Sequence, residues 1–221
     1  MRDARQLAKT AFVDSLISTL SSIRLANVFN PYVDVCDEHD DSLSPSIRKQ
    51  NLLLFLSSAL ETEPETVWIG RDLGYRGGRR TGLPLTDEGH LLIFREVFEV
   101  PASKATRTTD VKERTAAEIW RAIQLIKQPP FLWNAFPFHP HEPGEPLNNR
   151  CHTKKEFEVC EELLQGLLDV FGFARIFVLG NEAARAMERL GKSYTYVRHP
   201  SYGGQSEFRK QMSEAYGVRL S

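Results

Sequence analysis

The chain has 221 residues, of which 41% are hydrophobic and 26% are charged, proportions typical of a globular protein with one well-filled core. Its 28 Lys and Arg residues nearly balance 29 Asp and Glu residues, so the formal net charge of −1 excludes a polybasic nucleic-acid binder. No apolar run approaches the roughly 18 residues of a membrane span, and neither a secretory signal nor a disulfide framework is evident, so we expect a cytoplasmic protein that has no membrane partner.

The first part of the chain is expected to contain two helices. Apolar residues at helical spacing predict an amphipathic helix over residues 4–26. The acidic stretch 34–41 is expected to stay solvated. A second helix is predicted over residues 44–60, with Ser44 as its N-cap and Pro45 in its first turn.

The remainder alternates between strands and helices. Short apolar runs predict strands at residues 67–69, 131–134, 175–179 and 194–197. Helices are predicted at 109–127, after the capping box of Thr153 and Glu156, at 182–190 and at 205–216. Such alternation implies a parallel sheet with helices on both faces. We therefore predict an α/β fold over residues 1–221, a single-domain three-layer sandwich with a four-stranded parallel sheet and a helical extension at 1–29.

Ligands of such sheets bind beyond the carboxyl ends of the strands, and three segments there carry polar chemistry. The first, residues 70–86, holds four arginines and one acid, Asp72, and therefore has a net charge of +3. Its glycines let a backbone approach a ligand closely, although it matches neither a Walker A loop nor a Gly-x-Gly-x-x-Gly motif. The segment is either a phosphate-facing loop or a solvated basic turn.

The second segment, residues 133–141, places an Asn at the end of a strand. The amide of Asn134 offers a donor and an acceptor to a planar base edge, or else it satisfies its own turn. Zinc is a further possibility in this region, but the spacing of the candidate ligands is loose, so no metal is expected. Those candidates are His139, His141, Cys151 and His152.

The third segment, residues 197–204, contains His199 followed by a proline and small residues. A histidine at a strand end can stabilise a developing anion, or it can be a satisfied structural residue. Each of the three signals is weak when it is taken alone. Their common place after strands of one sheet is the stronger argument for a site.

In this order, the segment 70–86, the turn at Asn134 and the tripeptide 199–201 resemble the motifs of the uracil-DNA glycosylase superfamily. The resemblance extends from roughly residue 30 to the C-terminus. It implies a compact α/β domain with a four-stranded parallel sheet and a pocket that accepts a nucleotide swung out of DNA.

The resemblance also implies a role for each matched residue. Asp72 would position the attacking water, and His199 would stabilise the departing base. Asn134 would read the base. The other residues that would contact the base are Gly74, Tyr75 and Leu85. Those expected to contact the DNA backbone are Arg71, Arg76, Arg79, Arg80, Pro200, Ser201, Gly203 and Gly204.

Two positions depart from the family pattern. Gly74 stands where uracil-specific members use a Tyr to exclude the thymine methyl group, and Leu85 stands where many members hold the base under a Phe. Both changes enlarge or soften the pocket near the 5-position of a pyrimidine. Some branches carry an iron–sulfur cluster on four cysteines, which a chain with three cysteines does not build by itself.

The resulting hypothesis is a monomeric DNA glycosylase that needs no cofactor and acts on double- or single-stranded DNA. Its substrate is either uracil, in base-excision repair, or a bulky 5-modified pyrimidine, in defence against phage with modified DNA. One alternative is a binding module that keeps the fold without cutting. Another is a hydrolase of free nucleosides, which the basic segment disfavours.

Overall fold

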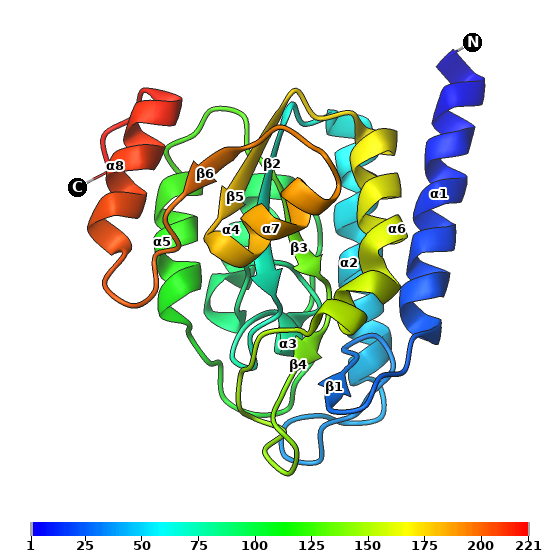
Figure 1. Ribbon diagram of the computed structural model, residues 1–221. Helices are drawn as coiled ribbons and strands as arrows, with labels where there is room; N and C mark the ends of the chain where they lie inside the picture. The colour runs from blue at the N-terminus through cyan, green and yellow to red at the C-terminus, as the bar shows by residue number, and fades with distance from the viewer. Residues whose placement is uncertain (1, 221) are drawn as a thin grey trace.

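The structure is a computed structural model that describes residues 2–220 (Figure 1), with side chains from residue 6 onward. The strands are β1 (Val28–Phe29), β2 (Thr66–Asp72), β3 (Phe131–Phe136), β4 (His139–Pro140), β5 (Arg175–Leu179) and β6 (Thr195–Val197). The helices are α1 (Arg2–Ser22), α2 (Ser44–Thr62), α3 (Gly78–Thr81), the 3-10 helix η1 (Glu88–His90), α4 (Leu91–Phe98), α5 (Arg114–Ile123), α6 (Lys154–Phe171), α7 (Asn181–Arg189) and α8 (Gln205–Tyr216).

Four strands form the parallel sheet that the sequence predicts, in the order β3-β2-β5-β6. Strand β2 is central, and its Gly70 lies directly opposite Asn134 of β3. A separate two-stranded ribbon pairs β1 with β4 in antiparallel fashion, which links the N-terminal region to the segment after β3.

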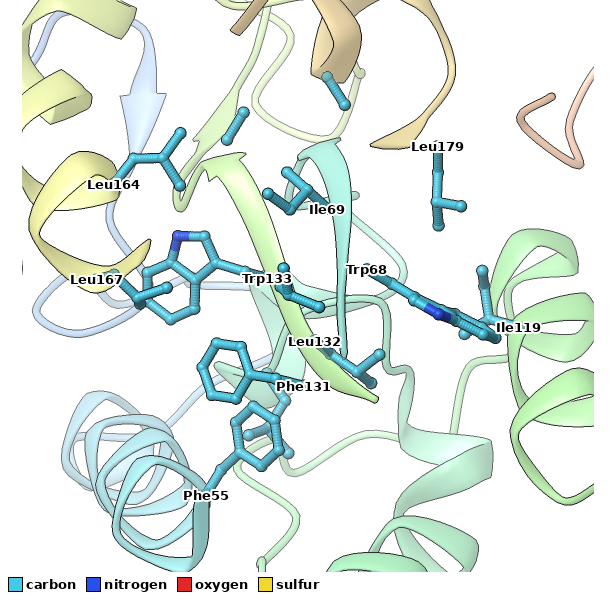
Figure 2. Close-up of a cluster of buried hydrophobic side chains, with 14 of the residues drawn as sticks. Phe55, Trp68, Ile69, Ile119, Phe131, Leu132, Trp133, Leu164, Leu167 and Leu179 are labelled. Carbon is cyan, nitrogen blue, oxygen red and sulfur yellow. The ribbon is translucent and has the colours of Figure 1, made fainter. Parts of the chain in front are cut away.

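Helices cover both faces of this sheet, as expected for a parallel sheet (Figure 1). Successive side chains of a strand point to opposite faces. Figure 2 shows Phe131 and Trp133 packed toward Phe55 of α2 and the leucines of α6, whereas Leu132 points to the side on which Ile119 of α5 lies. The three-layer α/β architecture predicted from the sequence is therefore confirmed.

The amphipathic helix predicted at the N-terminus is present as α1, which ends at Ser22 and packs its apolar face into the core through residues such as Leu16 and Leu20. The rest of the N-terminal region differs from the sequence prediction in two details. The stretch 34–41 is not wholly solvated, because Asp40 is buried in an ion pair with Arg48. Ser44 is the first helical residue rather than the N-cap, and its hydroxyl donates instead to the carbonyl of Ala105.

Elsewhere the predicted helices and strands are present, with shifted ends. The helix predicted over 109–127 spans Arg114–Ile123, while strand β5 and helix α8 have the predicted bounds. The capping box of α6 is confirmed, since Thr153 and Glu156 exchange hydrogen bonds. The short elements β1, β4 and α3, and the longer α4, have no counterpart in the prediction.

Two cavities lie at opposite edges of the sheet. One of about 570 Å³ is lined by residues at the amino ends of β2 and β3, such as Glu65 and Phe131. The other, of about 450 Å³, opens at the carboxyl ends of the strands, where the polar segments converge. Within residues 2–220, none of the helices combines the length and apolarity that crossing a membrane requires.

Candidate active site

The cavity at the carboxyl edge of the sheet brings together the three segments singled out in the sequence. Asp72, Asn134 and His199 all line it, although they lie far apart along the chain. The parallel topology explains this convergence, because Asp72 ends β2, Asn134 lies in β3 and His199 follows β6. A volume of about 450 Å³ falls within the ordinary range for small-ligand sites.

The carboxylate of Asp72 is held on both sides. Its side chain is only 3% exposed, and Oδ2 accepts a hydrogen bond from Nε of Arg71 at 2.5 Å. Oδ1 contacts Nδ1 of His152, whose ring packs between Phe136 and Phe157. Each carboxylate oxygen carries two lone pairs, so an acceptor position remains on each oxygen for a water molecule.

The amide of Asn134 has a fixed orientation. Its Nδ2 donates to the backbone carbonyl of Asp72 at 3.0 Å, which assigns the nitrogen to that side of the amide. Its Oδ1 is buried and has no hydrogen-bond partner among the described residues. Because a buried acceptor without a partner is unfavourable, this oxygen is suited to receive a ligand donor.

A glycine in β2 makes room for this amide. A Cβ atom on Gly70 would lie 2.8 Å from Nδ2 of Asn134 and 2.7 Å from Cδ2 of Leu85. Leu85 itself lines the cavity and adopts a left-handed backbone, with φ of 53°. Because Gly70 has no side chain, the amide of Asn134 and the side chain of Leu85 can both lie close to the backbone of β2 at this position.

His199 is a neutral donor in this setting. Burial, together with the positive charges of Arg71 and Arg198, lowers its pKa from 6.5 to about 4. The backbone N–H of Ser201 donates to Nδ1 at 3.2 Å, so the hydrogen of the neutral ring is on Nε2. The ring thus offers an N–H donor, as the sequence interpretation expects.

The loop after β6 is shaped by its small residues. Pro200 and Gly204 are buried, and a Cβ atom on Gly204 would lie 2.1 Å from the carbonyl oxygen of His199. Between them, Tyr202 is 97% exposed with φ of 51°, and Gly203 is exposed with φ of 76°. The loop therefore presents a tight, exposed turn beside the cavity.

The predicted arginine patch is only partly present. Arg76 is exposed and stacks its guanidinium on the ring of Tyr75, and Arg71 is partly exposed beside Asp72. Tyr75 is not among the residues that line the cavity, although the sequence interpretation has it contact the nucleobase.

Arg79 and Arg80, which the sequence interpretation places at the DNA backbone, instead contact other protein groups in this structure, so their contact with DNA stays a prediction. Both are buried. Arg80 forms an ion pair with Glu88 at 2.8 Å and donates to two threonine hydroxyls. Arg79 donates to the carbonyl of Pro146 and to Nδ1 of His139. The two guanidinium groups therefore join segments that are distant in sequence through ion pairs and hydrogen bonds.

Several cavity residues have no local signal in the sequence. Arg198 and Glu113 line the cavity, and the pKa of Glu113 is raised to about 7 by burial and by the charge of Asp87. His152 lies at the site because it contacts Asp72, and not as part of the zinc site considered in the sequence. His139, another of those zinc-ligand candidates, lies apart from it and contacts the carbonyl oxygen of Asn148.

One group of potential metal ligands lies at the site. Ligand atoms of Asp72, Cys151 and His152 all lie within 4.8 Å of one another. The carboxylate in this group already pairs with Arg71 and with His152. The positive charge of Arg71 also opposes the binding of a cation there.

A family model matches most of the chain. The family model described as Uracil DNA glycosylase superfamily matches residues 58–217, which include every segment that lines the cavity. The search of curated proteins finds no match to the chain.

Proposed function

The chain belongs to the uracil DNA glycosylase superfamily, and we propose that it hydrolyses the N-glycosidic bond of a uracil-type pyrimidine swung out of DNA, leaving an abasic site. Membership supports a DNA glycosylase-type function in general. The observation that carries the finer proposal is the unpartnered Oδ1 of Asn134, in one cavity with a carboxylate and a neutral histidine.

Donor and acceptor positions favour a uracil-type base over a cytosine-type base. The Nε2–H of His199 is suited to the O2 atom, which both bases carry. Beside O2, uracil presents N3–H, which Oδ1 of Asn134 can accept. Cytosine presents a lone pair at N3, which would face the same oxygen without a proton between them.

In the proposed reaction, the bond between the sugar C1′ and the base N1 breaks and its electron pair leaves with the base. Asp72 stabilises the positive charge on the sugar and holds the water whose oxygen bonds to C1′. The proton that this water loses neutralises the base anion. A donor aimed at a developing anion, such as His199, is typically worth about 2.7–4 kcal/mol.

Two substrates remain within this proposal. One is uracil, removed in base-excision repair, and the other is a 5-modified pyrimidine, removed in defence against phage with modified DNA. Leu85 lines the cavity in place of an aromatic ring, which supports room for a 5-substituent, whereas the space beside Gly74 is occupied by the carboxyl of Glu113.

The proposal is tested by identifying the free base that appears after incubation with DNA. Duplexes containing uracil at one position are incubated with the native protein and with Asp72→Asn, and free bases are measured by mass spectrometry. We expect uracil release by the native protein, a loss of roughly a thousandfold or more in the variant, and unchanged DNA binding. The matched control is Asp169→Asn, because Asp169 is an exposed acid on α6 far from the cavity lining.

The alternative is a binding module on the same fold. Pure binding needs no carboxylate at the sugar, so the retained Asp72 argues against it. Release of no base from any duplex, together with DNA binding that Asp72→Asn leaves unchanged, would favour the binding module.

A further inference from the structure

Glu113 is a cavity residue for which the reaction proposed above has no use. It directly precedes helix α5, and its backbone N–H is anchored by the side chain of Asp87. Its carboxyl lines the same cavity as Asp72, Asn134 and His199. No described residue donates a hydrogen bond to its carboxyl oxygens, so these oxygens are available to a ligand.

Two glycines make the space that this carboxyl occupies. A Cβ atom on Gly74 would lie 2.8 Å from Oε1 of Glu113, and a Cβ atom on Gly77 would lie 2.5 Å from Oε2. Neither glycine has the left-handed φ that would by itself require glycine. The absence of a side chain at position 74 therefore serves to admit the carboxyl of Glu113, which a larger residue would displace.

The surroundings of Glu113 suit it to both roles in a hydrogen bond. Burial and the neighbouring charge of Asp87 raise its pKa to about 7, while Arg76 acts in the opposite direction. Near neutral pH the group is therefore present both as a carboxylic acid, which can donate, and as a carboxylate, which accepts.

Two other polar side chains on the cavity wall are already engaged. Oδ1 of Asn149 accepts from the N–H of Tyr75, and the guanidinium of Arg150 pairs with Glu156. If Asn134 takes the N3 edge of the base and His199 takes O2, the carbon-5 edge must face another wall of the cavity. Glu113 lines the cavity with carboxyl oxygens that accept no hydrogen bond from a described residue, which makes it the candidate for that edge.

We propose that Glu113 is a specificity-determining residue that hydrogen-bonds a polar substituent on carbon 5 of the everted pyrimidine, so that the preferred substrate class is a 5-hydroxymethyl-type pyrimidine. This inference rests on the function proposed above. A hydroxymethyl group satisfies the carboxyl, whereas the methyl group of thymine buries it without a partner. A site built to hydrogen-bond a substrate hydroxyl discriminates strongly against an analogue that lacks the hydroxyl.

The test compares single-turnover base release from three duplexes that carry uracil, thymine or 5-hydroxymethyluracil at the same position. We expect the native protein to release 5-hydroxymethyluracil at least about a hundredfold faster than thymine. Glu113→Leu, which is similar in size and apolar, should reduce this ratio by about tenfold or more. Glu113→Gln should retain most of the ratio, because an amide also donates and accepts.

A second variant, Gly74→Ala, tests the position of the Glu113 carboxyl without replacing Glu113. Gly74→Ala leaves Glu113 in the chain but displaces its carboxyl, so it should lower the ratio as Glu113→Leu does. Glu96→Leu is the matched control, because Glu96 is an exposed acid on α4 away from the cavity lining. Melting temperatures of all variants verify that each is folded.

Failure of this inference is distinguishable from failure of the proposed function. Release of uracil with a 5-hydroxymethyluracil-to-thymine ratio that Glu113→Leu does not change would overturn the role of Glu113 and leave the glycosylase intact. Release of no base from any of the three duplexes would overturn both.

Discussion

The backbone N–H of Ser201 points at Nδ1 of His199, 3.2 Å away, and the Ser201 hydroxyl lies 2.7 Å from the same nitrogen. A turn of three residues therefore decides which ring nitrogen carries the hydrogen. The N–H that remains for a ligand is on Nε2. The turn after β6 thus determines that His199 presents a hydrogen-bond donor, and not an acceptor, to a ligand in the cavity.

This relationship predicts the acid limb of the pH profile. Because the pKa of His199 is lowered to about 4, the ring stays neutral at higher pH and gains a proton on Nδ1, against the Ser201 N–H, only as the pH falls through about 4. Uracil release under single-turnover conditions should therefore hold constant from pH 8 to 5 and fall below that. Glu113→Gln, which removes a group with a pKa of about 7, should give the same profile. A fall centred near pH 6.5, the ordinary value for histidine, would contradict the assignment.

The close approach at Gly70 predicts that Gly70→Ala damages the site. The added methyl would lie 2.8 Å from Nδ2 of Asn134 and 2.7 Å from Cδ2 of Leu85, so both side chains must shift. We expect about 1–3 kcal/mol less stability, as for other overpacked sites, and a loss of base release of at least tenfold. Gly144→Ala has open space but a φ of 79°, so it should cost about 1 kcal/mol and leave activity unchanged. Equal activity losses in the two variants would argue against a role for the contact.

The sheet and most helices could be predicted because their signals are local. Strand β5 is a run of consecutive apolar residues that ends before Gly180, and α6 begins at a capping box whose two members are three residues apart. The candidate site followed from the parallel topology, which places Asp72, Asn134 and His199 at one edge once the strands are known.

What could not be predicted depends on contacts between distant segments. The ribbon of β1 and β4 joins two-residue strands more than a hundred residues apart, and neither has a signal of its own. The burial of Arg80 depends on Glu88 and on threonines beyond α4, whereas in the sequence it is one more arginine of a basic loop. Glu113 enters the cavity only because Gly74 is small, a relation between two loops.

The burial of Arg80 predicts that its replacement affects stability. Arg80→Met leaves the carboxylate of Glu88 buried without its partner, which typically costs about 3–5 kcal/mol. Urea denaturation at pH 7 measures this loss. An unchanged midpoint would mean that the pair is not formed in solution.

Arg76 is the contrasting case, because its guanidinium is exposed beside Tyr75. Arg76→Ala should leave the urea midpoint unchanged and reduce the slope of log affinity for DNA against log salt concentration by about 1, the loss of one phosphate contact. Arg121→Ala, a surface arginine on α5 outside the cavity lining, is the control for a general charge effect. A slope that neither variant changes would remove Arg76 from the DNA-contacting surface.

The buried histidine His139 predicts how stability depends on pH. Burial and the adjacent charge of Arg79 lower its pKa from 6.5 to about 3, while the unfolded chain keeps the ordinary value. Between these values the unfolded state binds a proton that the folded state does not, so the free energy of unfolding must fall as the pH falls below about 6.5. From pH 7 to 5 this histidine should contribute a loss of about 2 kcal/mol, measured by urea denaturation. In His139→Gln that contribution should disappear, whereas His141→Gln should keep the native slope. If His139→Gln loses stability with pH as steeply as the native chain, the ring does not remain neutral in the fold.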